Sequence, residues 1–157
     1  MTLIYVPKYY NIKELVSPVV YNKYGNSAWM FFQGDPEYLM DLDFLREEWG
    51  SGIYLNTWAF PGVKPYRDEA AYRCNVDDIV RKKRGPYCSG HTMCKAFDPM
   101  PANGQYEKFW HFIWALITNG KFKRFNRIEH HKHTVAKGYV HIDSFSPSGK
   151  PEVFTIK

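Results

Sequence analysis

Two histidines and one aspartate have types and spacing that suit metal binding. His91 and Asp98 lie seven residues apart in one short segment, and on a turn that leads into a strand both side chains can reach one ion. His141 lies in a second segment, where strand alternation places its side chain on the same face as those of Tyr139 and Asp143. Two imidazoles and one carboxylate make a three-ligand zinc site whose fourth position stays open to water, which is the catalytic pattern.

A histidine with an aspartate seven residues later is common, so the zinc assignment depends on the surrounding residues. The string S-x-H-x-x-C-x-A-x-D, residues 89–98, resembles the S-x-H-x-x-G-x-A-x-D signature of the zinc D-Ala-D-Ala carboxypeptidases and phage endolysin peptidases. That family shares its metal fold with the hedgehog signalling domain. The string Y-V-H-I-D, residues 139–143, resembles the family's W-V-H-x-D segment, which supplies the last ligand. Weaker likenesses follow in the same order along the chain, at L-N-T-W (55–58), A-Y-R (71–73) and R-I-E (127–129).

The resemblance implies a role for each matched residue. The implied zinc ligands are His91, Asp98 and His141. Arg73 would bind a substrate carboxylate or carbonyl with its planar fork of donors, although an ordinary surface arginine is an equal alternative. Ser89 would brace the loop of the first ligand. Asp143 would either orient a ligand histidine or cap the end of the strand.

The activity that the resemblance implies is zinc-dependent hydrolysis of a peptide bond in bacterial peptidoglycan, of the D-Ala-D-Ala carboxypeptidase or endolysin type. The bond that is cut stays open, as does a phage or a bacterial origin. Residues 1–157 are expected to form a single zinc-peptidase-like domain that acts as a monomer on a peptidoglycan peptide.

Two departures from the family pattern concern backbone shape and catalysis. Cys94 replaces the family glycine, and a non-glycine residue is strained there if its φ is positive. Gly138 stands three residues before the last histidine, where many members carry the catalytic carboxylate. A zinc hydrolase needs a group that moves the proton of water, and we expect Glu129 to be this base. The alternative is a catalytically inactive zinc-binding relative that serves as a structural or cell-wall-binding module.

Other residues offer rival interpretations. His91 and the three cysteines could form a closed structural zinc site, since thiolates favour zinc. A second histidine cluster could also bind metal, although a solvated polar turn is the more ordinary reading. The aromatic residues could form a stacking surface for sugar or nucleic acid, but most tryptophans fall on segments that we expect to be core. The residues concerned are Cys74, Cys88 and Cys94, His130, His131 and His133, and Trp49, Trp58, Trp110 and Trp114.

The composition indicates one folded domain. The chain has 157 residues with 45% apolar and 18% aromatic residues, enough for one core, and its net charge of +5 could attract anionic polymers. No apolar run approaches the length of a membrane span, and the N-terminus does not resemble a signal peptide. We therefore expect no membrane or nucleic-acid partner, and a location in the cytoplasm of a host cell or on a virion, with the cell wall as target.

Two long helices and several short strands must position these residues. Helical spacing of apolar residues predicts helices over 35–49, with Asp35 as cap and Gly50 as end, and over 104–118. Shorter helices are expected over 11–16, where Asn11 and Glu14 suit a capping box, and around 76–83. Strands are expected over 52–58, 92–98, 121–129, 138–143 and 152–156, with a polar connection at 130–137. This order predicts an α+β fold, a mostly antiparallel sheet backed by helices, of the hedgehog and DD-peptidase type.

Overall fold

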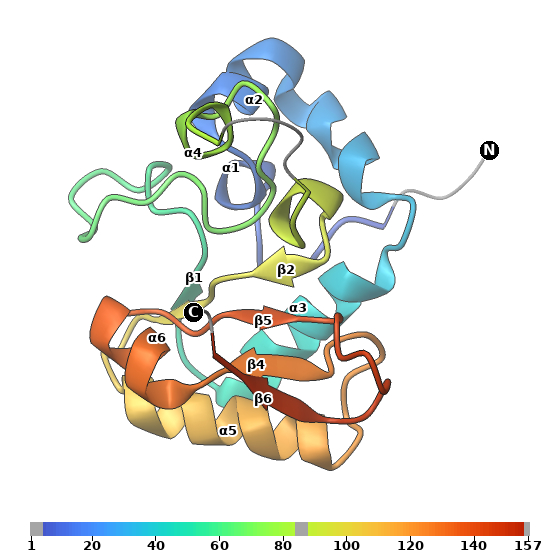
Figure 1. Ribbon diagram of the computed structural model, residues 1–157. Helices are drawn as coiled ribbons and strands as arrows, with labels where there is room; N and C mark the ends of the chain where they lie inside the picture. The colour runs from blue at the N-terminus through green and yellow to red at the C-terminus, as the bar shows by residue number, and fades with distance from the viewer. Residues whose placement is uncertain (1–4, 84–87, 156–157) are drawn as a thin grey trace.

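The structure is a computed structural model that describes residues 5–83 and 88–155 and, within these, all side chains except that of Val135. The end of the predicted strand 152–156 lies outside the described residues. Helices occupy both halves of the chain, and the strands are two or three residues long (Figure 1). The elements are, in order, α1 (Ile12–Leu15), α2 (Pro18–Tyr24), the 3-10 helix η1 (Gly25–Phe32), α3 (Glu37–Trp49), β1 (Ile53–Tyr54), α4 (Asp78–Arg81), the 3-10 helix η2 (His91–Met93), β2 (Ala96–Phe97), β3 (Met100–Pro101), α5 (Tyr106–Thr118), β4 (Arg127–Glu129), α6 (His131–Lys137), β5 (Ile142–Asp143) and β6 (Glu152–Phe154).

The strands form two small sheets. One has the strand order β2-β5-β4-β6, in which β6 runs parallel to β4 and the other neighbours are antiparallel. The second sheet pairs β1 with β3 in antiparallel fashion. The predicted α+β class and mostly antiparallel pairing are therefore confirmed, whereas the likeness to the hedgehog and DD-peptidase fold stays a prediction.

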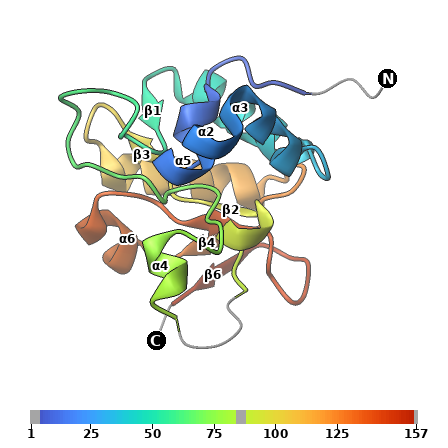
Figure 2. The ribbon, with the colours of Figure 1, turned by 90° about the horizontal axis from the view of Figure 1, so that it is seen from above.

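The helices α3 and α5 lie on one side of the larger sheet: they are behind its strands in Figure 1 and above them in the view of Figure 2. Apolar residues at helical spacing account for this position, since Leu39, Leu42 and Leu45 of α3 and Phe109 and Ile113 of α5 are buried. Burial of such side chains is worth about 1.5–3 kcal/mol each, which offsets the ordering of the chain. The other face of the sheet is thus left for polar residues.

The N-terminal half contains both confirmed and wrong predictions. Asn11 and Glu14 form the predicted capping box of α1, and Gly50 ends α3 in the left-handed conformation with a φ of 67°. Asp35 does not cap α3: Pro36 occupies the cap position, and Asp35 accepts a hydrogen bond from Arg124 Nε at 3.1 Å. The Asp35 carboxylate thus pairs with the positive charge of Arg124 and not with the backbone N–H groups at the start of α3.

The polar segment between the last predicted strands is a helix rather than a turn. α6 packs against α5, and the ring of His131 lies 5.5 Å from that of Trp110. Gly138, with a φ of 76°, ends α6 and returns the chain toward β5. Val140 and Ile142 are fully buried, so the predicted alternation of side chains around His141 is confirmed.

No helix within residues 5–83 and 88–155 has the length and apolar character needed to cross a membrane.

Candidate metal centre

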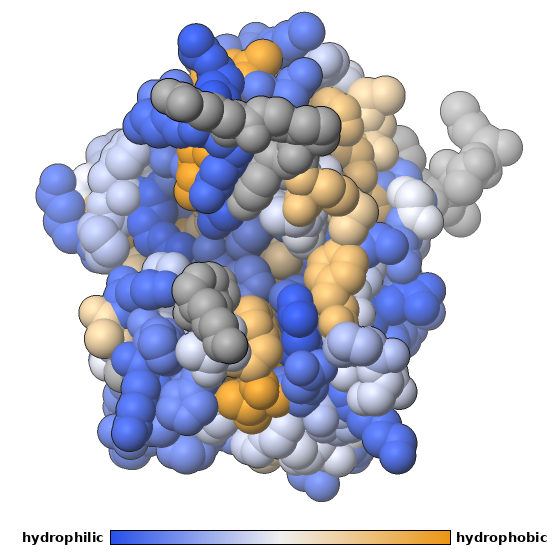
Figure 3. All heavy atoms as spheres, in the orientation of Figure 1, coloured by the Kyte–Doolittle hydropathy of each residue, from blue (hydrophilic) through white to orange (hydrophobic). Residues whose placement is uncertain are grey.

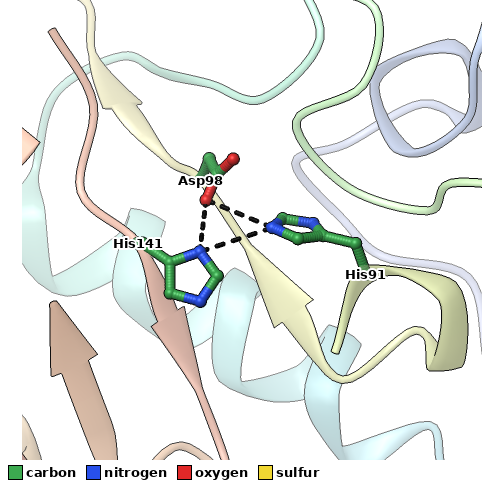
Figure 4. A group of neighbouring side chains, drawn as sticks. All are labelled: His91, Asp98 and His141. Atoms are coloured by element: carbon green, nitrogen blue, oxygen red, sulfur yellow. Dashed lines mark hydrogen bonds and ion pairs between the residues drawn. The ribbon is translucent and has the colours of Figure 1, made fainter. Parts of the chain in front are cut away.

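Three side chains from separate elements converge on one point. His91 begins η2, Asp98 directly follows β2, and His141 directly precedes β5. Because β2 and β5 are antiparallel with Phe97 opposite Ile142, Asp98 and His141 continue the same register. Figure 4 shows the two imidazoles and the carboxylate pointing toward one another. This buried group could hold a metal ion.

The distances between the donor atoms test this possibility. His91 Nε2 lies 3.3 Å from His141 Nδ1 and 3.4 Å from Asp98 Oδ1. Tetrahedral ligands about 2.0–2.1 Å from zinc lie roughly 3.3 Å apart, so these two separations suit a shared ion. The third, between His141 Nδ1 and Asp98 Oδ1, is 2.7 Å, which is a hydrogen bond. An ion would replace the proton of that bond and move the two atoms apart by about 0.6 Å.

Each imidazole is oriented by a hydrogen bond from its other ring nitrogen. His91 Nδ1 lies 2.8 Å from the carbonyl oxygen of Ala71, and His141 Nε2 lies 3.1 Å from Asp143 Oδ2. These acceptors leave His91 Nε2 and His141 Nδ1 directed at the ion position, as outer partners of metal ligands usually do. Of the two roles considered for Asp143, the structure shows contact with the ligand histidine.

Asp98 divides its oxygens between the imidazoles and two arginines. Its Oδ1 faces His91 and His141, while its Oδ2 lies 3.2 Å from Arg73 Nη2 and 3.5 Å from Arg67 Nη2. Burial alone would raise the pKa of Asp98, but the adjacent imidazoles hold it well below its usual range. Burial likewise lowers the pKa of His141, but hydrogen bonds to Asp143 and Asp98 outweigh it and raise this pKa to about 9. Asp98 is therefore anionic, as a carboxylate that binds a metal ion must be.

The ligands border a cavity of about 450 Å³ on the face of the sheet that α3 and α5 do not cover. Figure 3 shows a hollow near the middle of this face. Glu129, Tyr139 and Phe154 line the same cavity as the ligands. Charged and polar side chains thus converge in one cavity beside a few apolar ones, and convergent polar groups in a cavity are a usual mark of a ligand site.

Glu129 occupies the position directly opposite His141 in the β4–β5 pair. The strand register pairs Ile128 with Ile142, and the Glu129 amide donates to the His141 carbonyl at 3.0 Å. Opposed residues in such a pair point to the same face with Cβ atoms about 4.5–5.5 Å apart. Glu129 is only 1% exposed, and Lys137 Nζ lies 3.5 Å from its Oε1. The structure thus places Glu129, which we expected to be the base, at the same cavity as His91, Asp98 and His141.

Arg73 and Ser89 both border the cavity but contact the metal group in different ways. Arg73 donates from Nε to the carbonyl oxygen of Glu69 at 2.6 Å and from Nη2 to Asp98. Ser89 does not reach an imidazole. Its Oγ accepts from the amide of Thr92 at 3.4 Å, and its carbonyl accepts from Thr92 Oγ1 at 2.9 Å. Ser89 therefore holds the turn that carries His91.

Three residues of this site were not singled out by the motifs. Arg67 comes from the long segment after β1 and lies 4.3 Å from the centre of the Tyr139 ring. Arg127 grips Asp143 with two hydrogen bonds of 2.7 Å each. Phe154 reaches the cavity from β6. Only Arg127 had a signal in the sequence, as part of the R-I-E string.

The rival metal sites are not assembled. In the described part of the chain, the one group of three or more His, Cys, Asp or Glu residues with ligand atoms close enough to share an ion is His91, Asp98 and His141. None of the three cysteines shares such a group with His91, so the closed cysteine–histidine site is not assembled among the described residues. In the second histidine cluster, the ring centre of His130 lies 4.7 Å from that of His131 and 6.2 Å from that of His133. These three histidines do not form a group whose ligand atoms could share one ion.

Cys94 adopts the strained conformation that its position suggested, with a φ of 57°. Cys94→Gly is expected to be more stable than Cys94→Ala by about 1 kcal/mol. Both changes remove the thiol, but only glycine avoids the cost of about 1–2 kcal/mol for a side-chain-bearing residue in the left-handed conformation. Glycine also loses more backbone conformational entropy on folding, which offsets part of this gain. Thermal unfolding of the metal-free variants measures the difference as about 2–4 °C. Equal or greater stability of the alanine variant would show that Cys94 is not strained.

Comparison with known proteins leaves the site to be interpreted from its own residues. No protein-family model, no curated protein and no solved structure matches this chain.

Proposed function

We propose that this chain is a zinc-dependent peptidase that hydrolyses a peptide bond in bacterial peptidoglycan. The supporting observation is the convergence of three donor atoms at a cavity that also holds a buried carboxylate. Two imidazoles and one carboxylate suit zinc, and three protein ligands leave a position for water or substrate. The chemistry that zinc supplies is polarisation of a carbonyl oxygen and acidification of water to a pKa of about 7. His91, Asp98 and His141 would hold the ion.

Glu129 is the residue that we propose for proton transfer. Its position opposite His141 directs the carboxylate into the cavity beside the ligands. It would accept a proton from the attacking water and then pass it to the leaving amine. Lys137 Nζ contacts Glu129 Oε1 at 3.5 Å, and this contact helps to hold the carboxylate in place.

Arg73 would hold the substrate. Its Nε and Nη2 atoms are engaged by Glu69 and Asp98, which fixes the plane of the guanidinium at the edge of the cavity. We propose that its remaining N–H groups donate to a carbonyl or carboxylate of the peptide, a task for which arginine is suited.

The setting that suits such an enzyme is a phage product that acts as a monomer. It would be released in the host cell or carried on the virion, and it would act on the cell wall. The net charge of +5 favours approach to the anionic polymers of the wall.

A second candidate is an inactive zinc-binding relative that binds the wall without cutting it. The observations that favour it are Gly138 at the usual position of the base and the ion pair between Lys137 and Glu129. Hydrolysis distinguishes the two candidates, because both bind zinc.

Metal removal tests the peptidase proposal. Protein treated with a chelator is expected to release no peptide fragments from purified peptidoglycan, and added zinc is expected to restore release, because water near neutral pH is too weak a nucleophile without the ion. New amino termini in the soluble fraction, measured by amine labelling and mass spectrometry, report the cleavage. Magnesium is the matched control, since it prefers oxygen ligands and six-fold coordination. Release that is unaffected by the chelator would contradict the proposal.

A further inference from the structure

Phe154 contacts the metal centre from the last strand of the chain. Its ring centre lies 5.6 Å from that of His141, at an interplanar angle of 76°. The same ring lies 4.1 Å from the guanidinium carbon of Arg127. The Phe154 ring thus contacts both His141 and Arg127.

Arg127 fixes the carboxylate that orients His141. Its Nε and Nη2 atoms donate to the two oxygens of Asp143 at 2.7 Å each, the fork geometry in which carboxylate and guanidinium share a plane. Asp143 Oδ2 then accepts from His141 Nε2 at 3.1 Å, while the Phe145 amide donates to Oδ1 at 3.0 Å. The plane of the arginine therefore determines the direction of His141 Nδ1, the atom that faces the ion position.

The aromatic ring limits the motion of this arginine. The Arg127 side chain is 21% exposed, so part of it borders water and is not confined by packing alone. A ring face whose centre lies 4.1 Å from the guanidinium carbon restricts the motion of the guanidinium and attracts its charge. β6 holds the ring in place, because it pairs in parallel with β4 as far as Phe154, which lies opposite Glu129. At the two ends of this pairing, Glu152 donates to the Asn126 carbonyl at 3.0 Å and His130 donates to the Phe154 carbonyl at 2.7 Å.

We infer that Phe154 is a positioning residue for metal binding, which acts on His141 directly and through Arg127 and Asp143. The inference rests on the proposed zinc site and extends it to the C-terminal strand. Phe154 neither donates to the ion nor carries charge, so its contribution is the geometry of the ligand. Loss of an outer partner of a metal ligand lowers affinity about 10–100-fold, and Phe154, which is one contact further away, is expected at the lower end.

The test compares zinc affinity in Phe154→Leu with that in the wild type. We expect an affinity about tenfold weaker, measured by competition with a chromophoric chelator. Cobalt replaces zinc as a spectroscopic probe, and its visible absorption is expected to change in Phe154→Leu because the ligand geometry relaxes. Val153→Ala is the matched control, since Val153 is the adjacent residue of β6, does not line the cavity, and is 38% exposed. It should leave both measurements unchanged.

A double-mutant cycle separates positioning from loss of packing. In an Arg127→Met background, Phe154→Leu should weaken zinc binding by clearly less than tenfold, because only the direct contact of the ring with His141 is left to lose. Unfolding of each metal-free variant shows that it is folded before titration. Wild-type affinity and an unchanged cobalt spectrum in folded Phe154→Leu, or an undiminished effect in the Arg127→Met background, would overturn the inference. Failure of the wild type to bind zinc would instead refute the proposed function. If Phe154→Leu does not fold, two other variants provide the test. Phe154→Tyr, which keeps the ring, should bind zinc as the wild type does. Arg127→Lys should bind zinc more weakly, and wild-type affinity in Arg127→Lys would overturn the inference.

Discussion

Replacing Glu129 by glutamine is expected to lower the rate of peptidoglycan hydrolysis by about 100- to 10,000-fold while zinc stays bound. Glutamine has the shape of glutamate but cannot accept a proton from water, and proton transfer by a positioned side chain contributes a factor of this size. Zinc should be retained because Glu129 is not among the three converging ligands. Initial rates of fragment release and metal analysis of the same preparation measure the two effects.

Glu107→Gln is the matched control for this prediction. Glu107 is the other carboxylate between Asp98 and His141 in the sequence, and it is exposed in the first turn of α5. Its replacement should change neither rate nor zinc content. If Glu129→Gln cuts as fast as the wild type, another group moves the proton. If the wild type binds zinc and cuts nothing, the inactive relative is the better description.

The resemblance of two short segments to a known family was sufficient to predict which three side chains converge in the candidate metal group. His91 and Asp98 were predicted from one motif, and the structure places them on a turn and at a strand end, as that motif required. His141 was predicted from the resemblance of Y-V-H-I-D to the family segment, and alternation predicted its face correctly, since its neighbours Val140 and Ile142 are fully buried. These predictions depend on a few adjacent residues, and adjacent residues share a local backbone geometry.

The residues that surround the ligands could not be predicted in this way. Arg67 reaches Asp98 across 31 residues of sequence, and Phe154 reaches Arg127 from a strand that pairs parallel to β4. No periodicity in the sequence encodes such contacts, because they depend on how the elements pack. Glu129 is an intermediate case: elimination among carboxylates suggested it, and only the β4–β5 register shows that it faces His141.

Packing also explains the wrong prediction for residues 130–137. Histidines and lysines lack an obvious apolar stripe, so the segment resembled a turn. In the structure Thr134 is fully buried and His131 lies against Trp110 of α5, so tertiary contacts stabilise the helix. The prediction of strands longer than those observed has a related cause. β-Forming residues continue beyond β1, but their backbone groups bond to other segments: Asn56 donates to the Glu14 carbonyl and Thr57 to the Arg67 carbonyl. The pairing with β3 therefore ends after Tyr54.

His91→Ala is expected to abolish the binding of one zinc ion per chain. Loss of an outer partner costs about 10–100-fold in affinity, so loss of a ligand should cost more than about 100-fold. Zinc at 100 times its dissociation constant stabilises a folded protein by about 2.7 kcal/mol, which for a domain of this size raises the unfolding temperature by roughly 5–10 °C. The wild type should show this rise and His91→Ala should not. Metal analysis and thermal unfolding with and without zinc measure both effects.

His133→Ala provides the comparison, because His133 belongs to the second histidine cluster and is exposed. This variant should keep one zinc ion and the full thermal shift, whereas His141→Ala should resemble His91→Ala. Cys88→Ser should also keep the ion, since Cys88 borders the cavity without belonging to the converging group. Iron in place of zinc would contradict the assignment, since two histidines and one carboxylate also suit Fe(II). Retention of zinc by both His91→Ala and His141→Ala would show that the metal binds outside this cavity. Glu129 would then have no zinc-bound water beside it to deprotonate.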